Sequence, residues 1–203
     1  MQSQAGHKLP TGYPARRVVL QLRVESQDGA AIFVSGSFDS RGRLLGADGT
    51  QLASEAAGGP QQPHHQRITS ADQVQIYEAV LADTAGKPTY RLLRASSYAK
   101  DNRLLPVGWD PNDAEIADIA PAGLGGDTNF VAGKDRLLYD VTLPAGQRGP
   151  LTVKATLYYQ PLSPRHAAEL MQTRVPEVLV LERMLATSGY RPETIADAKQ
   201  VVP

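Results

Sequence analysis

The sequence predicts a mainly β chain, an antiparallel β-sandwich of the immunoglobulin-like type with a short α-helical C-terminal extension. Apolar and polar residues alternate along several segments of the first three quarters of the chain, which is the pattern of strands. Long polar connections containing glycine and proline separate these segments, which favours antiparallel sheets over a parallel α/β sheet. Helical spacing appears only near the end. We therefore expect a β-sandwich domain over residues 1–161 and a helical extension over residues 162–203 that packs on it.

Two segments carry the strand pattern most clearly. Arg17 to Glu25 (RVVLQLRVE) and Leu151 to Gln160 (LTVKATLYYQ) place apolar side chains at every second position, as in a sheet with one face toward solvent. The pair Asp28-Gly29 predicts a tight turn after the first of them. Similar but weaker patterns predict further strands at residues 30–36, 73–81, 88–95 and 135–143.

The last part of the chain contains helix signals. Ser163 followed by Pro164 predicts a helix start, because serine caps the first turn and proline fits the first helical position. Residues 176–188 carry apolar side chains at helical spacing, and Gly189 is placed to end that helix. We expect residues 192–202 to be a trailing segment with weak helical character.

Composition excludes several classes of protein. The chain has 203 residues with 21 basic and 21 acidic side chains, so its net charge does not favour nucleic acid or an anionic membrane. It contains no run of about 18 apolar residues and no charged-then-apolar leader, so we expect neither a membrane span nor a signal peptide in this sequence. Cysteine is absent, which excludes thiol catalysis, disulfides and a covalently attached c-type haem on this chain.

Catalytic motifs are also missing. The sequence has no GxSxG nucleophile motif, no HExxH zinc motif and no glycine-rich phosphate loop. We therefore expect a binding or structural module and no enzyme.

The opening segment GHKLPTGYPARR, residues 6–17, concentrates candidate binding residues. A histidine beside glycine is accessible, and histidine is a common ligand of metals and of haem iron. Basic side chains bind carboxylates, phosphates or haem propionates. The alternative is a proline-stiffened loop whose polar groups pair locally and whose charges lie at a solvated strand edge. The candidates for cofactor binding are His7, Lys8, Arg16 and Arg17.

Other metal candidates are less specific. His64 and His65 are adjacent, and adjacent side chains on an extended strand point to opposite sides. His166 is expected to be a surface residue of the first C-terminal helix. The stretch WDPNDAEIAD crowds oxygen donors as calcium requires, although it lacks EF-hand spacing and turn chemistry explains it equally well. Its candidate calcium ligands are Asp110, Asn112, Asp113 and Glu115.

Four stretches resemble the cysteine-free C-terminal β-domain of multihaem c-type cytochrome family proteins. Residues 6–17 and the KDNRLLP part of residues 90–110 are the specific ones, whereas residues 71–81 and 151–161 are generic strands. The resemblance implies a periplasmic or cell-surface location and a haem-bearing partner domain or subunit. It implies haem c in the full-length protein or in that partner, with His7 as a distal ligand or haem-edge contact. No CxxCH motif exists in this sequence, so the haem-bearing part lies elsewhere.

The KDNRLLP stretch has two interpretations. It can form a turn in which Asp101 and Asn102 bond their own backbone and Arg103 pairs with a nearby acid. It can also be a docking surface, in which Lys100 and Arg103 meet haem propionates or an acidic patch.

These observations favour a non-catalytic structural or docking domain of a multihaem cytochrome-like electron-transfer protein, packed against haem-bearing domains. The alternative is an independent ligand-binding β-sandwich that recognises a carbohydrate or calcium. Its candidate site is the loop of residues 107–129 together with Tyr98 and Trp109.

Overall fold

A single large antiparallel sheet organises the chain. The computed structural model describes residues 1–203, except for the side chain at position 117. The strands are β1 (Arg17–Glu25), β2 (Ala31–Ser35), β3 (Ser37–Phe38), β4 (Leu44–Leu45), β5 (Arg67–Ile68), β6 (Ile76–Ala82), β7 (Pro88–Thr89), β8 (Ser97–Asp101), β9 (Leu138–Tyr139), β10 (Leu151–Gln160) and β11 (Glu193–Val202). The helices are α1 (Ile116–Ile119), α2 (Pro164–Leu170) and α3 (Pro176–Ser188), with 3₁₀ turns η1 (Ala53–Glu55) and η2 (Leu92–Arg94).

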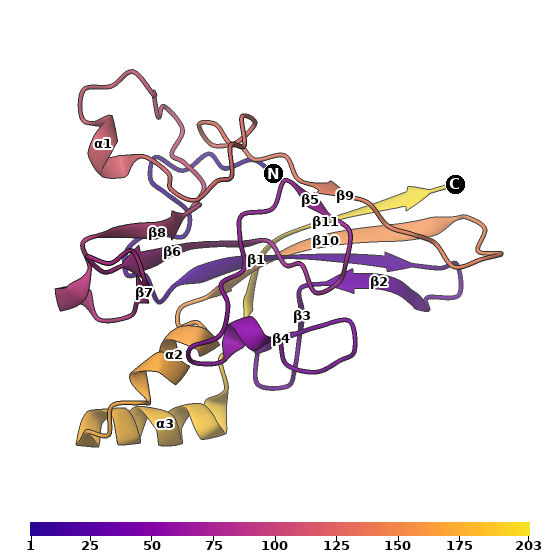
Figure 1. Ribbon diagram of the computed structural model, residues 1–203. Coiled ribbons are helices and arrows are strands. Elements are labelled where there is room, and N and C mark those ends of the chain that lie inside the picture. Colours follow the sequence, from indigo (N-terminus) through magenta and orange to yellow (C-terminus); the bar gives the residue numbers. More distant parts are fainter.

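The large sheet has the strand order β11-β10-β1-β6-β7, with β2 also paired to β1 and β8 to β6. All its strand pairs are antiparallel, so the prediction of a mainly β, antiparallel chain is confirmed. Two further sheets, β3-β4 and β5-β9, have two strands each. They do not amount to a second continuous sheet, and the immunoglobulin-like sandwich is therefore not confirmed. In Figure 1, α2 and α3 lie together on one side of the large sheet and α1 on the other.

The first part of β1 is buried on both faces. Val18 packs in one apolar cluster with Tyr77, Leu104, Leu105 and Phe130. Its neighbour Val19 points the other way and packs with Leu44, Val74 and Ile76. The expected solvent-facing side of this strand therefore begins only after Val19, because loops cover both faces of the sheet at this end.

The C-terminal region differs in part from the prediction. The helix α2 begins as expected, with Ser163 Oγ accepting a hydrogen bond from the His166 amide and Pro164 in the first turn. The helix α3 ends at Gly189, whose φ of 65° lies in the region that glycine favours. The weak helix expected at residues 192–202 is wrong, because this segment forms β11 along β10. All residues of β11 are exposed, so no burial pattern indicates a strand. The segment is a strand because it forms hydrogen bonds with the edge of β10.

Strand prediction succeeds where the alternation is long and fails where it is short. The structure has β1 and β10 with the predicted bounds. Residues 88–95 form only the short β7 and the turn η2, and residues 135–143 only the short β9. The strand β8 was not predicted, because its burial follows no alternation. In the part of the chain that the structure describes, no helix is long and apolar enough to cross a membrane.

A buried ion pair holds the loops to the sheet. The Arg17 guanidinium donates to both carboxylate oxygens of Glu55, at 2.6 and 2.7 Å, and to Oε1 of Gln160 at 2.8 Å. The Gln160 amide nitrogen donates to the carbonyl oxygens of Gly42 and Tyr190, at 2.8 and 2.7 Å. Burial alone lowers the pKa of Arg17, but the adjacent Glu55 outweighs burial and raises it. Arg17 is 1% exposed, so its guanidinium is not available to a propionate from outside.

The change Glu55→Gln is expected to lower the free energy of unfolding by about 3–5 kcal/mol, because it leaves the buried Arg17 charge without its partner. Urea denaturation at neutral pH measures this loss. The control is Asp140→Asn, which breaks the exposed pair between Arg67 and Asp140 and is expected to cost less than about 1 kcal/mol. Equal losses in the two variants would contradict the role assigned to Arg17.

Candidate functional site

The two specific stretches of the sequence lie against each other. The amide and carbonyl of Leu9 exchange hydrogen bonds with those of Leu104, at 3.0 and 2.9 Å. Beside this backbone pair, the Asp101 carboxylate accepts from Lys8 Nζ at 2.6 Å and from Arg103 Nε and Nη2, both at 2.7 Å. The loop of residues 6–14, here called the His7 loop, is therefore fixed to the chain segment that follows β8.

The charge of Asp101 is stabilised by these donors. Burial alone raises the pKa of a carboxyl, but the hydrogen bonds from Arg103 and Lys8 lower the pKa of Asp101 below its ordinary value. The Lys8 and Arg103 side chains are only 12% and 13% exposed. Both cations are thus held by this clamp and are largely shielded from solvent.

His7 itself faces solvent. Its Nδ1 lies 3.1 Å from the Lys8 carbonyl oxygen. A carbonyl only accepts hydrogen bonds, so in the neutral ring Nδ1 carries the proton and Nε2 keeps its lone pair. The other three histidines, His64, His65 and His166, are buried. The structure thus singles out His7 as the accessible imidazole of this chain.

The remaining basic candidates have different contacts. Arg16 is half-buried and donates from Nη1 to the Thr11 carbonyl oxygen, which ties it to the His7 loop. Lys100, expected at a docking surface, is 5% exposed, and its Nζ donates to Glu78 and to the Gln62 carbonyl. Arg103 lies over the ring of Tyr98 at 5.9 Å. Only Arg103 therefore connects the clamp with the protein surface at β8.

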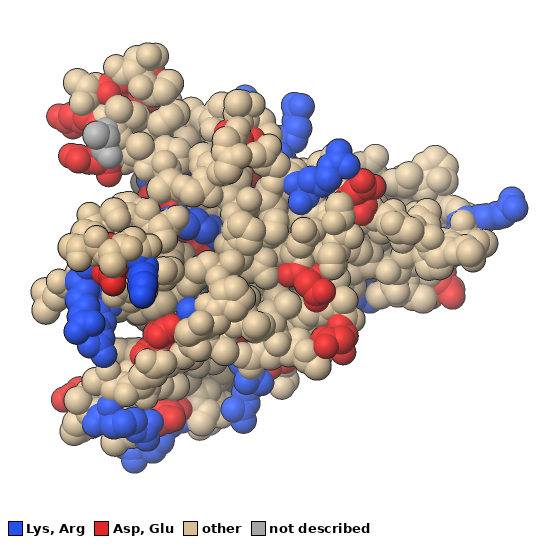
Figure 2. Space-filling model, in the orientation of Figure 1, with Lys and Arg blue, Asp and Glu red and all other residues tan. Residues whose placement is uncertain are grey.

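An exposed apolar turn next to β8 was missed by sequence reasoning. Leu93 is fully exposed and Leu92 is 49% exposed at the turn η2 between β7 and β8. Arg91 and Arg94 flank them and are also exposed. Figure 2 shows basic side chains gathered in this part of the surface, apart from the acidic side chains near α1. From the sequence, the RLLR segment is expected to be part of a strand. Because all four residues are exposed, the segment has no alternation of apolar and polar residues that would indicate its structure.

The acidic loop does not gather its oxygen donors around one point. Asp110 Oδ1 accepts from the backbone and side-chain nitrogens of Asn112, and Asp113 Oδ1 accepts from the Glu115 amide. These are turn-forming hydrogen bonds, and all four side chains are exposed. Among the described residues, the group close enough together to hold a metal ion lies elsewhere. It consists of His64, Asp127 and Asp135.

The His64 cluster is fully buried. Ligand atoms of His64, Asp127 and Asp135 lie within 4.8 Å of one another. His64 Nε2 lies 3.0 Å from Asp127 Oδ2, while its Nδ1 lies 3.0 Å from Gln75 Nε2 and 3.2 Å from Asn102 Nδ2. The sequence offered His64 as a ligand candidate but gave no sign of its acidic neighbours, which are more than 60 residues away in the chain.

Two amides fix the tautomer of His64. The Gln75 side-chain oxygen accepts from the His65 amide, and the Asn102 side-chain oxygen accepts from the Glu78 amide. Both side-chain NH₂ groups must therefore face His64 Nδ1, which can only accept. The ring proton is on Nε2 and is donated to Asp127. A metal at Nε2 would have to displace this proton, so the network favours a polar core over a metal centre.

His166 is not the surface residue that the sequence suggested. It is 5% exposed and lies between the rings of Tyr13 and Tyr90, with centroid distances of 5.5 Å to each. Burial lowers the pKa of His166, and Glu169 opposes this effect. The residue joins α2 to the end of the His7 loop and to the segment after β7, because packing of α2 on the sheet turns this side of the helix inward.

The fold defines a mainly β, antiparallel protein, and the site defines a surface histidine on an anchored loop. No protein-family model matches the chain, and no curated protein matches it. Among solved structures, the chain is similar to a penta-heme cytochrome c552 from Thermochromatium tepidum, at 17% identity and a TM-score of 0.49. The match covers 99% of this chain and 34% of the cytochrome chain, so the present chain spans about a third of its length. A likeness of this size does not establish a shared function.

The change Asp101→Asn is expected to lower the free energy of unfolding by about 2–3 kcal/mol, because two charge-assisted interactions are lost. It is also expected to free the His7 loop, so trypsin should cleave after Lys8 faster than in the unchanged protein. The control is Asp83→Asn, at a half-buried turn-forming aspartate that forms no ion pair with any described residue. Unchanged cleavage after Lys8 would show that Asp101 does not hold the loop.

The free energy of unfolding is expected to decrease when the pH is lowered, because His65 is harder to protonate in the folded protein. Burial, followed by Lys100 and His64, lowers the pKa of His65 to about 4 from its ordinary value of 6.5. Between these values the unfolded chain binds a proton that the folded chain does not. The contribution of His65 is therefore complete above pH 6.5 and is lost as the pH falls toward 4. It amounts to at most about 3 kcal/mol, less where solvent screens the ring.

Urea midpoints between pH 7 and pH 4.5 test this expectation. The decline should be smaller in His65→Gln than in the unchanged protein, and it should persist in the control His7→Gln, at an exposed ring. A parallel decline in the protein and in His65→Gln would refute the assignment.

Proposed function

We propose that the chain is a non-catalytic docking domain that packs against a haem-bearing domain or subunit and presents His7 to it. The observation that carries the proposal is the geometry of His7, an exposed imidazole whose Nδ1 is bonded to the Lys8 carbonyl, on a loop that the Asp101 clamp holds in place. The likeness of residues 6–17 and 90–110 to the multihaem cytochrome family supports the same proposal. An electron-transfer assembly at the periplasmic side or at the cell surface is the setting that we propose with it.

The chemistry of haem fits a set of exposed side chains that includes His7. Haem offers an iron with axial positions, an apolar ring and two anionic propionates, so its complement is an imidazole, apolar side chains and cations. His7 supplies the imidazole. Tyr98, in contact with Arg103 of the clamp, and the turn with Leu93 supply apolar surface, with Arg91 and Arg94 beside it. Exposed apolar residues with flanking charge are also common at protein interfaces.

The alternative function as a carbohydrate or calcium module has no specific observation in its favour. Its acidic loop is engaged in turns, and Trp109 is half-buried in the apolar cluster around Val18. Calcium at Asp110, Asn112, Asp113 and Glu115 remains a prediction of the sequence.

Spectroscopy with a ferric c-type haem peptide that has one open axial position tests the role of His7. Added protein is expected to convert the peptide to a low-spin spectrum, and the change His7→Ala is expected to abolish this conversion. The exposed neighbour Gln4 provides the control Gln4→Ala, which should behave as the unchanged protein. Because His7 is exposed, both variants should keep the unchanged urea midpoint. A conversion that persists in His7→Ala would exclude ligation by His7.

A further inference from the structure

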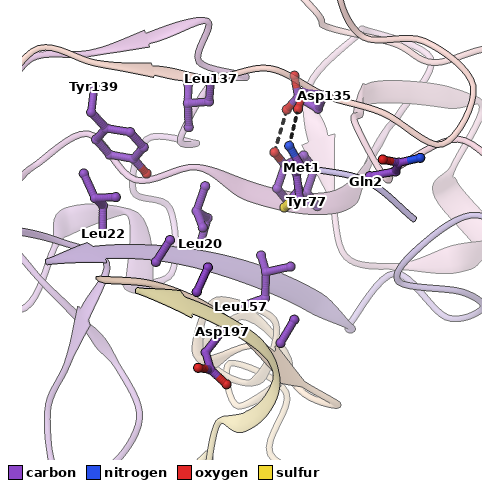
Figure 3. Close-up of a pocket in the computed structure, with 13 residues that line it drawn as sticks. Met1, Gln2, Leu20, Leu22, Tyr77, Asp135, Leu137, Tyr139, Leu157 and Asp197 are labelled. Atoms are coloured by element: carbon purple, nitrogen blue, oxygen red, sulfur yellow. Dashed lines mark hydrogen bonds between the residues drawn. The ribbon is translucent and has the colours of Figure 1, made fainter. Parts of the chain in front are cut away.

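An apolar cavity lies between the large sheet and the segment that leads into β9 (Figure 3). Its volume is about 430 Å³, within the range of small-molecule sites. One wall is the sheet face with Leu20, Leu22, Leu157, Ala196 and Ala198, and the opposite wall contains Leu137. The cavity is separate from the His7 loop, whose residues do not line it.

The apolar surface continues along the sheet. A second cavity of about 480 Å³ shares Leu22 and Tyr139 with the first and is lined further by Val24, Val153 and Val202. The strand register explains the continuity, because Val24, Leu22 and Leu20 lie opposite Val153, Ala155 and Leu157 on one face. Together the two cavities fit an elongated apolar molecule.

Two buried polar atoms of residues that line the first cavity accept or donate no hydrogen bond within the described part of the protein. These are Oδ1 of Asp135 and the hydroxyl of Tyr139. Asp135 is 3% exposed, and its other oxygen accepts from the Tyr77 hydroxyl at 2.5 Å. The amino group of Met1 donates to the backbone carbonyl of Asp135 and not to its side chain (Figure 3). The side-chain oxygen Oδ1 therefore has no donor. A buried carboxylate oxygen without a donor is costly, which favours a ligand that supplies one.

The charges near Asp135 also favour a ligand that donates hydrogen bonds. Among the residues that the structure describes, no lysine or arginine forms an ion pair with Asp135 or with the nearby Asp127. His64 donates its proton to Asp127 and faces amide nitrogens on its other side. The Met1 amino group, which also lines this end of the cavity, donates to the Asp135 backbone carbonyl and forms no ion pair with the Asp135 carboxylate, whereas the rest of the wall is apolar.

We propose that this cavity binds an elongated apolar molecule whose polar end donates hydrogen bonds, in particular a primary ammonium group, to Asp135. The apolar part lies along the face formed by β1, β10 and β11. The Tyr139 hydroxyl contacts the ligand near the junction of the two cavities. This site is independent of the docking role of His7.

Calorimetry with two probes of equal chain length tests the proposal. Octylammonium is expected to bind about 10- to 100-fold more tightly than octanoate, since a charge-assisted hydrogen bond to Asp135 is gained in one case and repulsion in the other. The change Asp135→Asn is expected to remove this preference. Equal affinity for the two probes, tighter binding of octanoate, or no binding of octylammonium would overturn the proposal.

A second variant guards against loss of folding in Asp135→Asn. Ala198→Phe fills the cavity from the exposed strand β11 without touching the polar cluster, and it should reduce octylammonium binding at least 10-fold. Its control is Lys199→Phe, which places the same ring at the next position, outside the cavity lining. Equal binding by the two variants would show that octylammonium binds elsewhere and would overturn the proposal.

Discussion

The buried pair of Arg17 and Glu55 is the constraint on which the arrangement of loops depends. A guanidinium away from water must place each of its donors on an acceptor, because an unpaired buried charge costs several kcal/mol. Its acceptors come from η1 and from β10, and the same network reaches the loop at Gly42 and the link before β11 through Gln160. Glu55 Oε2 also accepts from the Leu44 amide. One charge at the start of β1 thus sets the positions of segments that no strand pairing connects.

The polar residues of the most specific sequence stretches mainly build the scaffold. Lys8 and Arg103 both pair with the single carboxylate of Asp101, and Lys100 pairs with Glu78. Asn102 bonds the backbone of β6 on both sides of Tyr77. These contacts explain why a stretch that looks like a charged docking patch is largely buried. They also explain why the histidine that follows Gly6 can stay exposed, since the loop does not need its side chain for anchoring.

The sequence was informative where one long regular pattern decides the structure. The alternation predicted β1 and β10 with their bounds, and Ser163-Pro164 predicted where α2 begins. The strand β11 could not be predicted, because an exposed edge strand depends on its neighbour and has no burial pattern. Likewise, His7 could be named from a local motif, whereas the cluster of His64, Asp127 and Asp135 depends on contacts between distant segments. Spacing in one chain does not reveal such contacts.

The buried polar groups around Arg17 and around His64 differ in their charge balance. Around Arg17 one cation meets one anion, and the amides of Gln160 complete the hydrogen bonds, so the system serves the fold without any further group. Around His64 the imidazole donates to Asp127, the Asp135 carboxylate lies close by, and the second ring nitrogen is already occupied by amide donors. A structure that needed only rigidity would gain more from apolar side chains at these positions than from an incomplete network. An apolar cavity that ends at a carboxylate oxygen without a donor is the arrangement that the proposed ammonium ligand would complete.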